Sequence, residues 1–166
     1  MWKEYRMGDL FALSAIKQAQ SQAMIPPAQK GGSAVHYIVQ STKNNMYKME
    51  ADKQWLVDNG EAPVAGNAIA LGVTLPAVSY QPEEFGASQV ITARAEFLND
   101  KVGPFFVMVI QKLMVQFSYG KKPGLSIYRD LKLKLPSMNE SIAFDYIEAY
   151  IDSLKGERLQ LVKAYL

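Results

Sequence analysis

The clearest candidate for chemistry is a run of five polar side chains that follows a stretch of high β-propensity, residues 35–39. The run consists of Ser41, Thr42, Lys43, Asn44 and Asn45. Asparagine can bind adenine through two hydrogen bonds in the major groove, and lysine can bind guanine or a phosphate. Asparagine also suits the left-handed backbone of a tight turn. We therefore predict a DNA-contacting loop here, with Lys48 beside it; the alternative is an ordinary polar turn.

A second candidate group lies where the longest internal helical pattern ends. Tyr119, Lys121 and Lys122 surround Gly120, which leaves the backbone open to a ligand. Phosphate oxygens accept about half or more of protein–DNA hydrogen bonds, and lysines supply many of them. These residues are predicted to clamp the DNA backbone; the alternative is a solvated loop.

A third group flanks the loop at residues 82–87 and could reach the same groove. It consists of Tyr80, Gln81, Ser88 and Gln89. Two glutamates within this loop would repel phosphate. Tyr80 and Gln81 are nevertheless kept as candidate DNA contacts.

Other chemistry has little support in the sequence. The chain has no cysteine and one histidine, His36, which stands within a predicted strand. There is no phosphate-binding glycine motif, nucleophile elbow or zinc-protease motif. Asp130-Leu131-Lys132 is a D-x-K triplet of the kind found in metal-dependent nucleases, but a strand pattern explains it better. We predict no catalytic residue, metal ligand or cofactor, and hence no enzyme; a nuclease is the remaining alternative.

Composition and charge are those of a globular protein with unevenly distributed bases. The 166 residues are 49% hydrophobic and 20% charged, and the net charge is +2. Lysine and arginine dominate residues 1–49 and 112–134, and acids dominate residues 50–100. If the basic segments meet in space, they form a positive face that suits a polyanion. The first residues do not resemble a signal peptide and no apolar run could span a membrane, so a cytoplasmic protein without membrane contact is expected.

The pattern of elements predicts one mixed α/β (α+β) body, residues 1–136, followed by a helical arm, residues 137–166. Strands are expected at residues 35–39, 67–73, 77–80, 89–93 and 126–135. A helix is expected over residues 98–119. A second helix is expected from Ser141 to the last residue, with Asn139 or Ser141 as its N-cap.

The second helix carries an apolar stripe. Ile147, Ile151, Leu154, Leu161 and Tyr165 recur at helical spacing, with Arg158 between them. Such a stripe can pair with a partner helix, for example in a homodimer. The alternative, that it packs on its own domain, stays open.

The order of these segments resembles the target-recognition domain of type I restriction–modification specificity subunits, and related recognition domains of BcgI-like enzymes. The matching segments are 8–11 (GDLF), 37–45 (YIVQSTKNN), 66–72 (GNAIALG), 80–81 (YQ), 117–122 (FSYGKK), 131–136 (LKLKLP) and 144–151 (FDYIEAYI). Two departures are that the chain holds one domain and one helix where a full subunit has two of each, and that Met46 stands where the family usually has glycine.

The resemblance implies a non-catalytic specificity subunit, or half-subunit, that binds double-stranded DNA. Its partners would be the modification (M, methyltransferase) and restriction (R) subunits, and its terminal helix would act as a spacer or pairing arm. The alternative function is a protein-interaction module that docks on a restriction complex without reading DNA.

Overall fold

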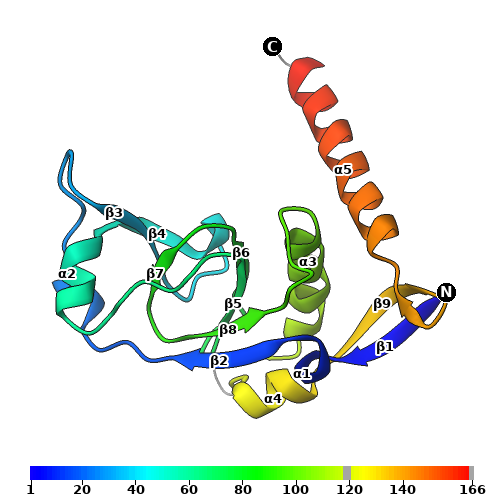
Figure 1. Ribbon diagram of the computed structural model, residues 1–166, viewed down its shortest axis with the longest axis horizontal. Coiled ribbons are helices and arrows are strands. Elements are labelled where there is room, and N and C mark those ends of the chain that lie inside the picture. The colour runs from blue at the N-terminus through cyan, green and yellow to red at the C-terminus, as the bar shows by residue number, and fades with distance from the viewer. Residues whose placement is uncertain (118–120, 165–166) are drawn as a thin grey trace.

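The computed structural model describes residues 1–117 and 121–164, and it confirms a mixed α/β fold with three sheets and a C-terminal helix (Figure 1). The first sheet has the strand order β2-β8-β5-β6 and is antiparallel. Its strands are β2 (Ala12–Ile16), β5 (Ala68–Gly72), β6 (Val78–Gln81) and β8 (Val90–Arg94). Every residue of β5 and β6 is buried, because these strands lie in the middle of the molecule.

A second sheet packs beside the first and carries the candidate loop. Its order is β4-β3-β7, with β3 antiparallel to β4 and parallel to β7. The strands are β3 (Ala34–Ile38), β4 (Tyr47–Asp52) and β7 (Phe85–Ala87). Short helices accompany it: η1 (Gln22–Met24), η2 (Asn44–Met46) and α2 (Lys53–Asp58). The side chain of Asp52 caps α2 by accepting a hydrogen bond of 3.0 Å from the Trp55 amide.

The third sheet joins the two ends of the body. Strand β9 (Lys132–Met138) pairs with β1 (Trp2–Arg6) on one side and with β10 (Ser141–Ile142) on the other. Trp2 lies opposite Pro136, so the strand continues past residue 135, where it was predicted to end. The expected division after residue 136 falls inside β9.

Helix α3 (Val102–Met114) covers the first sheet and forms the centre of the main core. Phe106 and Ile110 are fully buried there, and the Phe106 ring contacts Phe11 edge-on at 5.1 Å. The helix is shorter than predicted. It begins after Asn99, whose Oδ1 accepts hydrogen bonds of 2.9 Å from the amides of Lys101 and Val102.

The prediction of one strand over residues 126–135 is wrong in its first half. Residues Leu125–Asp130 form helix α4, which packs near α1 (Met7–Leu10), and only the Leu/Lys alternation belongs to β9. The helix forms here because Tyr128 makes a contact with a residue distant in the sequence. Tyr128 is buried, its hydroxyl donates a 2.6 Å hydrogen bond to the Gly72 carbonyl, and burial raises its pKa.

Helix α5 (Phe144–Ala164) rises from the body beside the N-terminus and then projects from it (Figure 1). It begins later than predicted, because Asn139 and Glu140 form the left-handed turn between β9 and β10 and Ser141 belongs to β10. Ile147 and Ile151 are buried in the main core, whereas Leu161 is 53% exposed. The predicted stripe therefore packs on its own body in its first half only, and Tyr165 lies outside the described residues.

Candidate nucleic-acid interface

The loop between β3 and β4 is tightly built. Asn44, Asn45 and Met46 have φ angles of 49°, 51° and 65°, all in the left-handed region. The Val39 amide donates to the Met46 carbonyl at 2.9 Å, and the Met46 amide donates to Lys43 at 3.0 Å. The predicted left-handed asparagine turn is confirmed. Met46 adopts the conformation that glycine would favour and is held there by its buried side chain.

Strand β6 anchors this loop from below. Asn45 Nδ2 donates to the Tyr80 carbonyl at 3.1 Å. In return, Gln81 Nε2 donates to the Asn45 carbonyl at 3.1 Å and to Ser79 Oγ at 2.9 Å. The amide of Asn45 is thus engaged with the protein. The side chains of Thr42, Lys43 and Asn44 point to solvent, Ser41 is half-buried and Lys48 is exposed on β4.

Tyr80 and Gln81, which were predicted as DNA contacts, are buried and do not present their side chains to solvent. Their exposed fractions are 8% and 5%, because both lie in a strand buried on both faces. The Tyr80 hydroxyl donates to Asn67 Oδ1 at 2.8 Å, and burial, reinforced by the nearby Asp100 carboxylate, raises its pKa. Both residues position the loop. Ser88 is buried as well, whereas Gln89 is exposed.

Gln40 is a positioning residue that the sequence analysis did not identify. Its Oε1 accepts hydrogen bonds from the amides of Val73, Thr74 and Leu75, at 2.8, 2.6 and 3.4 Å. This contact ties the turn between β5 and β6 to the start of the candidate loop. The only available signal was a single glutamine immediately before the polar run, and it does not indicate a distant partner.

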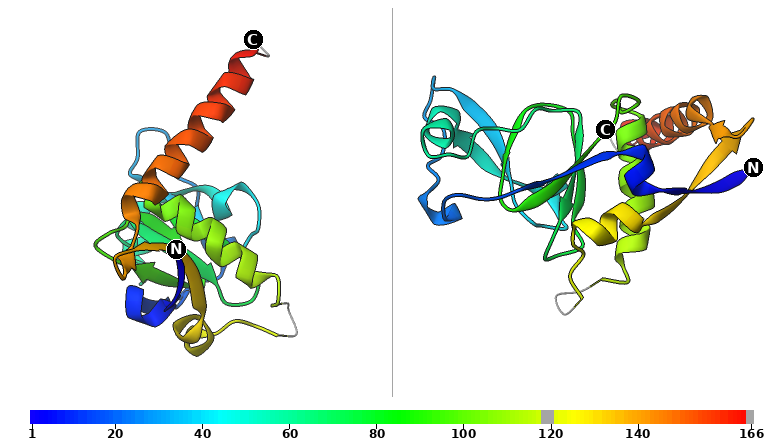
Figure 2. Two further views of the ribbon diagram at one scale, coloured as in Figure 1. Left: turned by 90° about the vertical axis from the view of Figure 1, so that its right-hand side faces the viewer. Right: turned by 60° about the horizontal axis from the view of Figure 1, so that its bottom comes forward.

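The basic loop after α3 lies on the same side of the molecule as the candidate loop. In the left view of Figure 2, the cyan segment around residue 45 and the yellow-green segment that follows α3 both lie toward the right. Lys121 and Lys122 are exposed, and Lys121 Nζ lies 5.6 Å from the centre of the Phe117 ring. Tyr119 lies outside the described residues.

The two basic segments of the sequence do meet, where β1 pairs with β9, but acids accompany them there. Arg6 Nη2 lies 2.6 Å from Asp130 Oδ1, and Lys132 Nζ lies 3.7 Å from Glu4 Oε2. Lys3 also pairs with Glu140. These ion pairs reduce the positive charge where the segments meet, and the exposed side chains of Lys112 and Lys134 retain part of it. The exposed lysines of the candidate interface lie elsewhere, at positions 43, 48, 121 and 122.

The remaining candidates for chemistry are engaged in local contacts. Asp130, from the D-x-K triplet, pairs with Arg6, and His36 Nε2 lies 2.8 Å from Glu50 Oε1 on the neighbouring strand. Within residues 1–117 and 121–164, no group of three or more His, Asp or Glu side chains could hold a metal ion. No described helix is long and apolar enough to cross a membrane.

Comparisons with known proteins give a consistent result at the level of structure. No protein-family model and no curated protein matches the sequence. Among solved structures, the HsdS subunit from Thermoanaerobacter tengcongensis matches 99% of this chain with a TM-score of 0.61 and 12% identity. The S subunit of the type I restriction–modification system from M. genitalium matches 99% with a TM-score of 0.58 and 15% identity.

A third match comes from a structural study of the assembly and conformational transition of the type I R-M system. It covers 98% of this chain with a TM-score of 0.60 and 13% identity. In all three, the match spans only 40–41% of the known chain. This chain therefore has the fold of the target-recognition region of type I restriction–modification specificity subunits. It spans about two fifths of the length of the matched subunit chains.

Proposed function

We propose that this protein binds double-stranded DNA sequence-specifically as a non-catalytic specificity half-subunit of a restriction–modification system. The observation that carries the proposal is the loop at residues 41–46, which is rigidly anchored and yet exposes polar side chains. The fold shared with type I specificity subunits supports the same conclusion. A preorganised loop suits recognition, because its ordering cost is met on folding and not on binding.

The roles of the exposed residues follow from their chemistry. Asn44 presents a carboxamide that can bind adenine through two hydrogen bonds, and Thr42 can contact a base or a thymine methyl group. Lys43, Lys48, Lys121 and Lys122 supply charge for phosphates or guanine. In this proposal Asn45, Tyr80 and Gln81 hold the loop, and Tyr119 is kept as a candidate DNA contact on its residue type alone. Modification and restriction subunits would supply the chemistry that this chain lacks.

Salt dependence of duplex binding tests the proposal. We expect the intact protein to bind a random-sequence DNA duplex weakly, and to lose affinity steeply between about 50 and 200 mM salt, because each lysine that contacts a phosphate releases counterions. Fluorescence anisotropy with a labelled duplex measures this. Selection from a randomised duplex pool should enrich one short motif. Absence of binding at the lowest salt would favour a module that docks on proteins alone.

We further propose that two copies pair through α5 in antiparallel orientation. Its apolar side chains Leu161 and Val162, on and beside the predicted stripe, are 53% and 56% exposed. Residues 145–152 carry three acids and no base, whereas residues 153–164 carry three bases and one acid. An antiparallel pair brings the acidic end of one helix to the basic end of the other, and it also opposes the helix dipoles favourably.

Two charge substitutions on α5 provide a matched test of pairing. Leu161 lies on the predicted stripe and Leu159 lies on another face of the helix, and both are exposed. We expect Leu161→Glu to convert a dimer into a monomer, because the substitution places a charge in the seam, and Leu159→Glu to remain dimeric. Size-exclusion chromatography with light scattering distinguishes these states. A wild-type protein that is monomeric at high concentration would contradict the pairing.

A further inference from the structure

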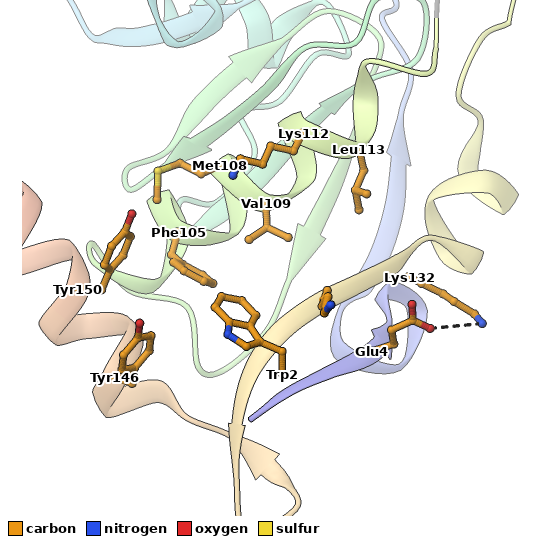
Figure 3. Close-up of a pocket in the computed structure, with 11 residues that line it drawn as sticks. Trp2, Glu4, Phe105, Met108, Val109, Lys112, Leu113, Lys132, Tyr146 and Tyr150 are labelled. Atoms are coloured by element: carbon orange, nitrogen blue, oxygen red, sulfur yellow. Dashed lines mark ion pairs between the residues drawn. The ribbon is translucent and has the colours of Figure 1, made fainter.

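A groove of about 620 Å³ opens on the outer side of α3 (Figure 3). Its floor is the outward face of the helix, formed by Met108, Val109 and Leu113. Strands β1 and β9 form one side, and the first turns of α5 form the other. The groove is large enough to hold apolar side chains of another molecule.

The composition of α3 indicates that its outward face is suited to burial against another molecule. Of its 13 residues, Gln111 and Lys112 alone are polar or charged. A helix that is apolar on all sides is normally buried on all sides. Here the inner face is buried in the core, but Met108, Val109 and Leu113 are only half-buried.

Three exposed aromatic side chains border the groove. Trp2, Tyr146 and Tyr150 are 52%, 56% and 42% exposed, and Figure 3 shows the ring of Trp2 below Phe105 and to the right of Tyr146. A second hollow of about 330 Å³ begins on the other side of Trp2 and Tyr146. Trp and Tyr are the side chains that most often dominate binding energy at protein interfaces, above all beside pockets that a partner can fill.

The rim of the groove is basic. Lys112, Lys132 and Lys134 line it together with one acid, Glu4. Lys132 lies 3.7 Å from Glu4, whereas Lys112 and Lys134 form no ion pair within the described part of the chain. The groove therefore carries net positive charge around an apolar floor.

We infer that this groove docks an acidic amphipathic helix from a partner protein. The partner's apolar face would cover the floor and the aromatic side chains, and its carboxylates would meet Lys112 and Lys134. Helix α5 of a second copy is a poor occupant, because its exposed distal half is basic. Nucleic acid is the competing occupant, because the aromatic rings at the border could stack with bases and lysines line the rim. The apolar floor favours an amphipathic helix instead, because that helix would cover the floor with its own apolar side chains.

A designed peptide serves as the probe. It has about 18 residues, or five turns, with Leu and Phe at i, i+3, i+4 and i+7 and Glu at the other positions, and a matched peptide carries Lys in place of Glu. We expect the labelled Glu peptide to bind the intact protein saturably in fluorescence anisotropy. We expect the Lys peptide to bind at least about tenfold more weakly. In a Trp55→Phe background, the Glu peptide should also shift the emission of Trp2.

Surface variants locate the binding site. Lys112→Glu/Lys134→Glu and Tyr146→Ala alter exposed side chains of the groove, and Lys30→Glu, at an exposed lysine that does not line the groove, is the charge control. The first two should each raise the Kd of the Glu peptide about tenfold or more, and the control should leave it unchanged. Circular dichroism verifies that all variants are folded.

Three outcomes would overturn the inference. They are equal binding of the two peptides, binding that the groove variants do not change, and displacement of the Glu peptide by single-stranded oligothymidylate. The last would assign the groove to nucleic acid. Because none of these measurements uses duplex DNA or α5 pairing, they are independent of the proposed function.

Discussion

Substitution of Gly103 by alanine is expected to lower the free energy of unfolding by about 3 kcal/mol. Gly103 lies in the first turn of α3, against the ring of Tyr80. A Cβ atom there would lie closer than 3.0 Å to three carbon atoms of that ring. The ring cannot move aside, because it is buried and its hydroxyl is bonded to Asn67. The helix must then shift away from β6.

Urea denaturation followed by circular dichroism measures this loss as a lower midpoint. Gly156→Ala is the matched control: no atom lies within 4 Å of the added Cβ, and alanine is the better helix former. We expect that variant to be at least as stable as the wild type. A Gly103→Ala protein with an unchanged midpoint would show that Gly103 of α3 does not pack against the Tyr80 ring of β6.

Reversal of charge at Lys43 is expected to have the largest effect on DNA binding. Lys43 is exposed, and the hydrogen bonds of the loop use its backbone: its carbonyl accepts from the Met46 amide and its amide donates to Ser41 Oγ. Lys43→Glu therefore keeps the turn but replaces an attractive charge near a phosphate by a repulsive one. We expect a loss of at least about tenfold in duplex affinity and a decrease of about one or more in the slope of log K against log salt.

The same anisotropy titration on Lys30→Glu, which makes an identical change of net charge, is the control for a general charge effect. Equal losses for the two variants would mean that the protein binds DNA through its overall charge and not through this loop. Asn44→Ala adds information on sequence reading. A base contact should lower affinity for the selected motif more than for random duplex, by about 1–3 kcal/mol.

Segments whose local pattern agreed with their final environment were predictable. Strands β3, β5, β6 and β8 are β-branched or small-residue runs between turn residues, and the structure places each within one or two residues of its predicted position. The left-handed turn followed from two consecutive asparagines. These features depend on residues that are neighbours in the sequence.

Elements stabilised by distant partners were not predictable. Strand β1 consists mainly of charged and aromatic residues and exists because it pairs with β9. Helix α4 alternates like a strand, and the hydrogen bond from Tyr128 to Gly72 favours the helix instead. Likewise, Gln81 was a plausible DNA contact by residue type, and only the structure shows that Ser79 and Asn45 occupy its amide.

The pairing of β1 with β9 has a consequence for the rate of folding. Its partners, such as Trp2 and Pro136, lie near opposite ends of the body, so closing this sheet requires a large loss of chain entropy. Proteins dominated by such long-range contacts fold slowly. During synthesis, β1 has no partner until β9 has been made, and the apolar surface of α3 stays uncovered in the meantime. The nascent chain should therefore be a substrate for chaperones until that sheet closes.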